Sequence, residues 1–279
     1  MIDLHLHTSA SDGSLTPGET LAEARRRGLN IVAITDHDTV AGVKEALSLP
    51  GQGPTVIPGL EMTTRYRGRQ VDLLGYFIDI DDHELLERQE SYRAAVERRA
   101  RRVVESLQKA GFPLLWEEVF KLARGGFVHQ VKIMHALLQA GYLAQREEIL
   151  TAMPKWLGRG GPGYVPLEWT FPEPLQAISF IRRLGGIPVL AHPGRSNIDD
   201  YIPELVAAGL GGIEVYHSQH DPAKVAHYLA LAQRMNLLIT GGSDYHGLYN
   251  KADFLMGYLG IPDQLAEKLQ WAHQTSKGG

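Results

Sequence analysis

The chain contains no cysteine. Disulfides and thiolate metal sites are therefore excluded, and any bound metal must use nitrogen and oxygen ligands. The sequence also lacks an apolar run near the roughly 20 residues that a membrane-spanning helix needs. It does not start with a charged and then apolar segment, which is the pattern of a secretory leader. We therefore expect a cytoplasmic protein that makes no contact with membranes.

A strong excess of charge of one sign is also missing. The formal net charge is -4 over 279 residues, which argues against a bulk electrostatic grip on nucleic acid. Hydrophobic residues make up 44% and charged residues 22%, as in ordinary globular proteins. The length allows one large domain or one domain with an insertion. Nothing in the sequence indicates an obligate protein partner.

Strand-like and helix-like stretches alternate at both ends of the chain but not in its middle. This alternation over residues 1–82 and 168–279 favours βα units and a parallel sheet. Residues 83–167 are instead predicted to be mainly helical, and they begin with a long Arg-rich helix over residues 84–110. We therefore predict a barrel built from the two outer parts, with 83–167 as an inserted helical subdomain.

The stretch over residues 2–13 predicts the first part of a metal site. His5 and His7 alternate with apolar residues, so on a strand both imidazoles point to the same face. Asp12 follows in a turn that ends at Gly13. Two histidines spaced in this way are, on their own, more often an ordinary polar strand face than a metal site. The prediction therefore depends on ligands from elsewhere in the chain.

Other predicted strands supply such ligands at or just after their ends. Glu61, for example, follows a short strand predicted over residues 55–58. The residues at these positions are His37, Glu61, His192, His217, Asp244 and His246. In barrels of parallel strands, this end carries the active site. The set is larger than one four-coordinate site needs, so we predict two or three divalent ions, Mn²⁺, Fe²⁺ or Zn²⁺, with a carboxylate that bridges two of them.

These motifs resemble those of the PHP (polymerase and histidinol phosphatase) domain phosphoesterases. The matching pieces occur in the family's order: His5-Leu-His7 with Asp12, Thr35-Asp-His-Asp38, Gly59-Leu-Glu61, Ala191-His-Pro-Gly-Arg195 and Gly242-Ser-Asp-Tyr-His246. The helical insertion resembles that of the branch acting on nucleoside monophosphates, 3′,5′-bisphosphates and short RNA ends. The shared features are the Arg-rich helix, the stretch 136–142 and the Gly-rich loop before Tyr164-Val165.

The resemblance implies an α/β fold, a distorted (β/α)₇ TIM-like barrel with an inserted helical subdomain, and a three-metal cluster. It also implies a ligand set for each metal: His5, His7, Glu61 and Asp244 for the first; Glu61 and His192 for the second; and Asp12, His37 and His246 for the third. Asp72, near the start of a strand predicted over residues 71–78, is a departure, because many relatives have histidine there. We expect Asp72 to ligate the second metal and to change its metal preference.

Four further residues have two interpretations each. Arg195 is predicted to bind phosphate, and the alternative is a salt bridge across the barrel mouth. His217 either donates a proton to the leaving oxygen or orients a metal ligand. In the insertion, relatives often have Arg-Pro-His where this chain has Gln130-Val131-Lys132. His129 and Lys132 could take over as phosphate or nucleotide contacts, or they could be ordinary surface residues.

The sequence thus predicts a metal-dependent phosphoesterase that uses metal-activated hydroxide to hydrolyse a small phosphate ester. The expected substrate is a nucleotide, AMP or a 3′,5′-nucleoside bisphosphate, with short RNA 5′ ends as a further option. One alternative is histidinol-phosphate phosphatase. An alternative of another class is a non-catalytic PHP module of a polymerase or other assembly, which degraded ligands would have indicated. A metal-dependent amidohydrolase typically needs a bridging lysine after a strand, and no good candidate is present.

Overall fold

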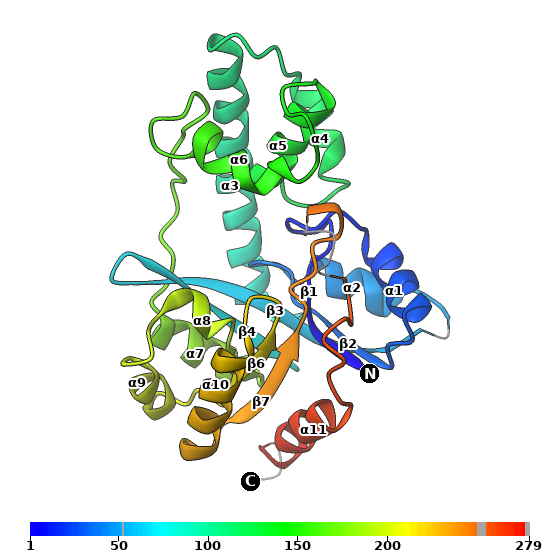
Figure 1. The fold of residues 1–279 in the computed structure, drawn as a ribbon, viewed down its shortest axis with the longest axis vertical. Coiled ribbons are helices and arrows are strands. Elements are labelled where there is room, and N and C mark those ends of the chain that lie inside the picture. Colours follow the sequence, from blue (N-terminus) through cyan, green and yellow to red (C-terminus); the bar gives the residue numbers. More distant parts are fainter. Residues whose placement is uncertain (52, 250–254, 277–279) are drawn as a thin grey trace.

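The structure, a computed structural model, describes residues 1–51, 53–249 and 255–276 and has two lobes (Figure 1). The lower lobe is a seven-stranded sheet that curves into a nearly closed barrel with helices around it. The upper lobe contains helices only. The predicted distorted TIM-like barrel with a helical insertion is confirmed. No helix in the described ranges has both the length and the apolar character that crossing a membrane requires.

The strands follow the barrel wall in the order in which they occur along the chain. They are β1 (Ile2–Leu6), β2 (Ile31–Ile34), β3 (Thr55–Tyr66), β4 (Arg69–Tyr76), β5 (Ile187–Leu190), β6 (Gly212–His217) and β7 (Leu238–Gly242). Neighbouring strands are parallel except that β4 runs antiparallel to both β3 and β5. The start of β4 therefore lies at the same end of the barrel as the ends of β2, β5, β6 and β7.

The β3–β4 hairpin differs from the sequence prediction. The strand expected over residues 55–58 continues to Tyr66, so Glu61 lies within β3 rather than after it. A two-residue turn at Arg67 and Gly68 returns the chain, and both residues have positive φ angles, 48° and 78°. Such turns match the twist of paired strands. Because the hairpin pairs Thr63 with Asp72, the start of β4 is brought to the ligand-bearing end of the barrel.

The barrel closes between β1 and the chain just after β7. The Asp244 N–H donates to the His5 carbonyl at 3.0 Å, and the His7 N–H donates to the Tyr245 carbonyl at 3.0 Å. Gly242 makes this approach possible, because a Cβ atom at this position would overlap the backbone and Cβ of His5. Residues 5–7 and 244–246, two segments that each carry two candidate ligands, are thereby held side by side.

Helices cover the outside of the barrel and bury its apolar side chains. They are α1 (Pro17–Arg26), α2 (Ala41–Ser48), α7 (Pro174–Arg183), α8 (Pro193–Ser196), α9 (Ile202–Ala207), α10 (Pro222–Arg234) and α11 (Gln264–Ser276), together with the 3₁₀ turn η1 (Gly247–Tyr249). Local capping defines α1: the Glu19 N–H donates to the Thr16 hydroxyl and the Thr16 N–H donates to the Glu19 carboxylate, with Pro17 at the first position.

The upper lobe has a hydrophobic core of its own. It consists of α3 (His83–Lys109), α4 (Trp116–Leu122), α5 (Gln130–Gln139) and α6 (Glu148–Leu157). The second half of α3 packs with the three shorter helices around Val103, Leu107, Met134 and Leu137, which are fully or almost fully buried. The first half of α3 packs against the barrel through Leu85. The exact limits of an inserted subdomain at 83 and 167 stay a prediction.

The segment between α4 and α5, together with the first turn of α5, ties the upper lobe to α1 and to the turn that carries Asp12. The Phe127 N–H donates to the Ala10 carbonyl at 3.0 Å. The buried Lys132 ammonium donates to the Gly13 carbonyl. Arg124 makes a two-pronged ion pair with Glu19 of α1, at 2.7 and 2.9 Å. The upper lobe is therefore attached to the barrel at the site itself as well as through the chain connections.

Candidate metal centre

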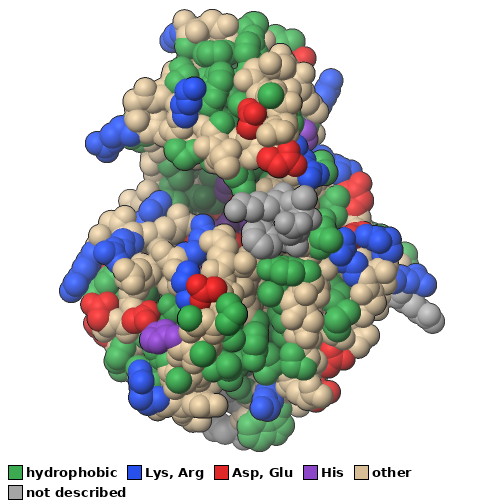
Figure 2. Space-filling view, in the orientation of Figure 1, with side chains coloured by type: hydrophobic (Ala, Val, Ile, Leu, Met, Phe, Trp, Pro, Cys, Tyr) green, Lys and Arg blue, Asp and Glu red, His purple; other side chains and the backbone are tan. Residues whose placement is uncertain are grey.

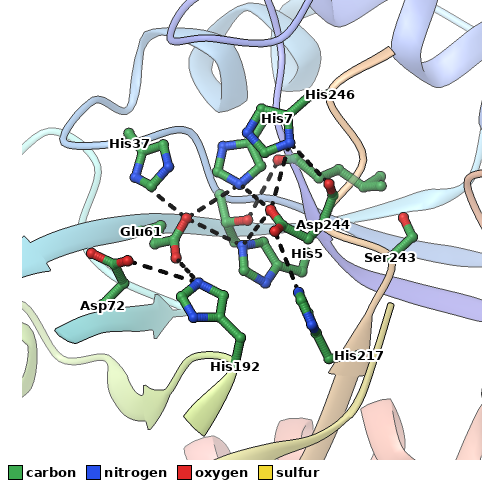
Figure 3. A network of polar contacts seen from close by, with 12 residues as sticks. His5, His7, His37, Glu61, Asp72, His192, His217, Ser243, Asp244 and His246 are labelled. Carbon is green, nitrogen blue, oxygen red and sulfur yellow. Dashed lines mark hydrogen bonds and ion pairs between the residues drawn. The ribbon is translucent and has the colours of Figure 1, made fainter. Parts of the chain in front are cut away.

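The candidate ligands converge at the barrel end that faces the upper lobe (Figure 3). Their ligand atoms form groups within which all atoms lie within 4.8 Å of one another. The groups are His5, His7, Glu61 and Asp244; His7, Asp12, His37 and His246; Glu61, Asp72 and His192; and His5, Glu214 and His217. Space-filling Figure 2 shows histidine side chains in the hollow between the two lobes.

The first group is buried, and only Asp244 of it keeps a small exposed fraction, 8%. His7 Nε2 lies 3.2 Å from Glu61 Oε2 and 3.1 Å from Asp244 Oδ1, and His5 Nε2 lies 3.2 Å from Glu61 Oε2. Both ring nitrogens of His7 are buried, yet neither makes a hydrogen bond of acceptable geometry. Buried polar atoms without a partner are rare in native proteins. This arrangement fits a shared cation toward which the ligand atoms point.

The second group lies nearer the cavity and includes the Asp12 turn. Asp12 Oδ1 is 3.3 Å from His246 Nε2 and 3.5 Å from His7 Nδ1, and Asp12 Oδ2 is 3.9 Å from His37 Nε2. The buried Asp36 carboxylate holds this turn, because it accepts hydrogen bonds from the Thr8 N–H and hydroxyl and from the Ser11 hydroxyl. Three imidazoles and a carboxylate are thereby placed around one point.

The third group includes Asp72. Glu61 Oε1 lies 2.9 Å from His192 Nε2, and Asp72 Oδ2 lies 3.8 Å from the same nitrogen. Gln70 donates its amide N–H groups to both Asp72 oxygens, at 3.1 and 2.9 Å. The structure thus brings Asp72 to the centre in an orientation compatible with ligation, from the start of the antiparallel strand β4.

Glu61 is shared between groups. Its Oε2 atom faces His5, His7 and His37, whereas its Oε1 atom faces His192. Since two oxygens of one carboxylate point to different sets of ligands, Glu61 has the geometry of a bridging ligand. Its position in the middle of a long strand, with a relative exposure of 0%, fixes that geometry.

The backbone is strained where two candidate ligands follow their strands. His192 has φ of 27° and Asp244 has φ of 55°, both in the left-handed region that side chains other than glycine rarely adopt. Such strain persists only where the surroundings fix it, and it is frequent at functional sites. At Asp244, the hydrogen bond from its N–H to the His5 carbonyl fixes the conformation. The strain therefore directs both side chains into the barrel mouth.

Glu214 is a buried acidic residue that the sequence analysis missed. Its Oε1 lies 3.0 Å from His5 Nδ1, and its Oε2 accepts the His192 N–H at 2.8 Å. It therefore orients one ligand and the backbone of another, as residues behind metal ligands usually do. The available signal was a single acidic residue in the otherwise apolar start of strand β6.

Inside the cluster, neighbouring groups of opposite charge outweigh the effect of burial on the pKa values of His7 and Glu61. Burial by itself would lower the pKa of His7, but the adjacent carboxylates of Asp244 and Glu61 outweigh burial and raise this pKa to about 10. Burial would raise the pKa of Glu61, but the neighbouring His37 and His5 hold it well below its usual range. In the absence of a cation, His5 and His7 would therefore carry protons that a bound metal ion would replace.

Asp72 behaves differently from the other carboxylates. Burial, together with the negative charge of Glu61, raises the pKa of Asp72 to about 7. The positive groups nearest to Asp72 offset the effect of burial on its pKa less than the histidines around Glu61 do for the pKa of Glu61. Asp72 is therefore the carboxylate that depends most on an added cation to carry its charge.

His217 and Arg195 lie beside the first group. The Gln219 N–H donates to His217 Nδ1 at 3.1 Å, and His217 Nε2 lies 3.3 Å from Asp244 Oδ2. The Arg195 side chain is 48% exposed, and its Nη1 lies 3.7 Å from the same Asp244 oxygen. Both predicted residues are thus at the centre, the histidine buried behind it and the arginine at its open side.

A cavity of about 460 Å³ lies between the metal centre and the upper lobe. His129 lines it, and the His129 Nε2 atom is buried without a hydrogen-bond partner. Arg99 and Met153 also contribute to the wall on this side. Lys132 does not line the cavity: its ammonium is directed to Gly13 and lies 5.4 Å from the Tyr249 ring centroid.

Comparisons with known proteins agree on one family. The model of the PHP domain family matches residues 3–152. The 5′-3′ exoribonuclease Rnm of Salmonella typhimurium is 36% identical over 255 residues, which are 88% of this chain and 84% of that protein. The 3′,5′-nucleoside bisphosphate phosphatase of Chromobacterium violaceum is 31% identical over 252 residues, 88% of this chain and 87% of that protein. A Bifidobacterium adolescentis structure, named as a candidate metal-dependent phosphoesterase, has a TM-score of 0.81 at 30% identity and covers 97% of this chain and 95% of that one.

Proposed function

This chain belongs to the PHP domain family, and we propose that it hydrolyses phosphate monoesters of nucleotides, with AMP or a nucleoside 3′,5′-bisphosphate as substrate and short RNA 5′ ends as a further option. The expected family and its phosphoesterase activity are confirmed by the relatives described above. The near-complete ligand set gives no support to a non-catalytic module. What remains to be proposed is the substrate and the role of each residue.

One observation carries the proposal: the Glu61 carboxylate divides its oxygens between two ligand groups that border a nucleotide-sized cavity. A bridging carboxylate holds two cations close together, which is the arrangement used to activate water and bind phosphoryl oxygens. The cavity volume of about 460 Å³ lies in the range of small-molecule sites.

The donor set fits two or three divalent ions, Mn²⁺, Fe²⁺ or Zn²⁺. We assign one ion to His5, His7, Glu61 and Asp244, a second to Glu61, Asp72 and His192, and a third to Asp12, His37 and His246. When bound, such ions lower the pKa of a water molecule and stabilise the negative charge of a phosphoryl group. Phosphate binding, orientation of the metal ligands and contact with the nucleoside depend on side chains of the chain itself.

Arg195 is suited to bind the phosphate group. Its guanidinium lies at the open side of the centre, lines the cavity and is half-exposed, so it has donors available for a ligand. Two parallel N–H donors match two phosphate oxygens. Its weak contact with Asp244 at 3.7 Å keeps it near the centre without consuming those donors.

His217 is better suited to orient Asp244 than to act as a proton donor. The Gln219 N–H points at His217 Nδ1, so that nitrogen must carry a lone pair and the proton lies on Nε2. The resulting neutral imidazole donates a hydrogen bond to Asp244 Oδ2. Loss of a proton from this form would leave an imidazolate, which makes general-acid catalysis by His217 unfavourable. Of the two roles expected from the sequence, we propose the orienting one.

The upper lobe supplies the wall against which the nucleoside is expected to pack. His129 offers an unpartnered ring nitrogen, and apolar side chains such as Met153 offer surface for a base or sugar. We propose His129 as a nucleotide contact. We do not assign a substrate contact to Lys132, because its ammonium is already bonded to Gly13.

The test is metal analysis combined with phosphate release in the presence of Mn²⁺. The panel consists of AMP, 3′,5′-bisphosphoadenosine, histidinol phosphate and short 5′-phosphorylated RNA. His7→Ala should abolish turnover and lower the bound-metal content, whereas His83→Ala, at an exposed position on α3, should change neither. No turnover of any panel member would sink the proposal, and preference for histidinol phosphate would replace it with the alternative.

A further inference from the structure

The loop after β2 carries His37, and the polar contacts of this imidazole are long. Its Nδ1 atom lies 3.4 Å from Glu61 Oε2 and 3.5 Å from the Thr63 hydroxyl. Its Nε2 atom lies 3.9 Å from Asp12 Oδ2. These distances are beyond the usual range of hydrogen bonds in proteins. The place of the imidazole therefore depends on the backbone of its loop, residues 37–40.

Gln89 of α3 holds the end of this loop. Its side-chain oxygen accepts hydrogen bonds from the Thr39 hydroxyl at 3.0 Å and from the Val40 N–H at 2.9 Å, and Gln89 is only 8% exposed. Val40 is the N-cap of α2 and makes no capping bond through its own side chain. Gln89 thus supplies, from another helix, the acceptor that a capping box supplies locally. Removal of this acceptor would leave a buried backbone N–H without its partner.

Arg88, the preceding residue of α3, faces the middle of the loop. Its Nη2 atom lies 4.0 Å from Asp38 Oδ1, and this nitrogen and both Asp38 oxygens are buried without a hydrogen bond of acceptable geometry. The guanidinium also lies 5.3 Å from the centroid of the Trp169 ring, in the segment that returns from the upper lobe. A buried carboxylate needs a nearby positive charge. Arg88 therefore supports Asp38, the residue next to His37, from outside the barrel.

The helix α3 continues from these contacts to the cavity and the upper lobe (Figure 1). Its next turns, with Tyr92, Val96 and Arg99, line the cavity of about 460 Å³. Helices of the upper lobe roof this cavity, and we call it the roofed cavity. The second half of α3 then lies in the core of the upper lobe with Val103 and Leu107. One continuous helix thus contacts the His37 loop, the roofed cavity and the upper lobe.

The ligand groups of the centre differ in how far they depend on this helix and its neighbours. The four ligands of the first group belong to β1, to β3 or to the segment that is hydrogen-bonded to β1. The ion assigned to Asp12, His37 and His246 is different. Lys132 holds the Asp12 turn, and Gln89 holds the His37 loop. Two of its three ligands therefore depend on contacts with α3 and α5.

We propose that Arg88 and Gln89 are positioning residues for His37. Through them, α3 sets the affinity for the ion that the proposed function assigns to Asp12, His37 and His246, so this inference rests on that function. It adds two residues that neither line the roofed cavity nor belong to a ligand group. Their removal should weaken the binding of one ion selectively and leave the ions of the other two groups in place.

The first experiment counts Mn²⁺ ions in Gln89→Met, which keeps the bulk of the side chain but removes the acceptor. After dialysis, the variant should hold one ion per chain fewer than the wild type, because its affinity for that ion should be about tenfold weaker. The Mn²⁺ concentration for half-maximal AMP hydrolysis should rise by the same factor, and turnover should recover at saturating Mn²⁺. Recovery by metal separates a positioning role from a loss of structure. Gln270→Met, at an exposed position on α11, should behave as the wild type does.

A second series of variants changes the charge beside Asp38. Arg88→Met should weaken the binding of the same ion, whereas Arg88→Lys, which keeps a positive charge, should retain most of the affinity. Asp38→Asn added to Arg88→Met should restore the ion, because no buried carboxylate then lacks its counter-charge. Arg98→Met, at an exposed position on α3 without an ion pair among the described residues, is the control. This series also decides the question if Gln89→Met does not fold.

The outcomes separate this inference from the proposed function. Full ion content and an unchanged Mn²⁺ requirement in both Gln89→Met and Arg88→Met would overturn the inference alone. Loss of all ions together would do the same, since the two contacts would then support the whole barrel. Equal effects of Arg88→Met and Arg98→Met would also overturn it. A wild type that binds no Mn²⁺ or hydrolyses no phosphate ester would overturn the proposed function instead.

Discussion

The two walls of the roofed cavity are built on different physical principles. The barrel wall is a dense set of imidazoles and carboxylates that β1, β3, β4 and the segments following β5 and β7 hold in place. The opposite wall comes from α3, α5 and α6 and is mainly apolar, with Tyr92, Arg99 and His129 as its ionisable groups. Under the proposed function, one wall carries out the chemistry at phosphorus and the other contacts the rest of the substrate.

The difference also concerns how each wall is supported. The candidate ligands of the barrel are fixed by strand register and by buried partners such as Glu214 and Asp36. The helical wall is fixed by packing in the upper lobe and by the links from Arg124, Phe127 and Lys132 to the barrel. Substitutions in the barrel wall should therefore change metal binding and catalysis. Substitutions in the links between the upper lobe and the barrel should mainly shift the turn that carries Asp12.

The largest expected effect comes from the shared carboxylate. Glu61→Gln keeps the shape of the side chain but removes the negative charge between two ligand groups. We expect a loss of activity of more than about 100-fold, beyond that of changes behind the ligands, together with a lower metal content. Glu267→Gln, at an exposed position on α11, is the matched control. Full metal occupancy in Glu61→Gln would contradict a bridging role.

A smaller effect is expected one step behind the ligands. The Glu214 carboxylate accepts from both His5 and the His192 N–H. Glu214→Gln leaves a single acceptor oxygen for these two donors, because the NH₂ group of the new amide can only donate. We expect metal affinity to fall about 10- to 100-fold, as measured by competition with a chelating dye. An unchanged affinity would mean that strand register alone orients His5.

The sequence predicts the barrel wall well because its signals are local. The pairs His5/His7 and Asp244/His246, as well as His37, stand at strand ends, and such ends in a barrel meet at one mouth. Asp72 could not be placed with the same argument. It lies near the start of its strand, and only the antiparallel direction of β4 brings that start to the mouth.

Other features could not be predicted because they depend on packing between distant segments. The length of β3 follows from its pairing with β4, and no local signal ends a strand at Tyr66 rather than at Pro58. Lysine is a residue type that often binds phosphate, but the direction of the Lys132 side chain is set by where α5 meets the Asp12 turn. The left-handed conformations of His192 and Asp244 likewise depend on the surrounding tertiary structure.

The link through Lys132 tests whether the helical wall supports the barrel wall. Lys132→Met removes a charged hydrogen bond to the Gly13 carbonyl next to Asp12, and it also relieves the cost of burying an ammonium group. We expect a net loss of about 1 kcal/mol in the free energy of unfolding and weaker retention of one metal ion on dialysis. Lys121→Met, exposed on α4, is the control. An undiminished metal content would show that the helical wall does not support the metal centre through Lys132.

The smallest effect is expected for the ion pair between Arg124 and Glu19. The hydrogen bonds from Arg124 lower the pKa of Glu19 to about 2, from a usual value near 4.5. Because the folded-state pKa is lowered, the stabilisation is complete above about pH 4.5 and disappears as the pH falls toward 2. Both side chains are partly exposed, so Arg124→Gln should cost less than about 1 kcal/mol at neutral pH. The cost should vanish in acid when urea unfolding is followed at both pH values.

Arg98→Gln, at an exposed position on α3 with no ion pair within the described residues, should show neither the cost nor its pH dependence. A cost that persists in acid would show that Arg124 acts through packing, and its charge would then contribute nothing to the attachment of the upper lobe.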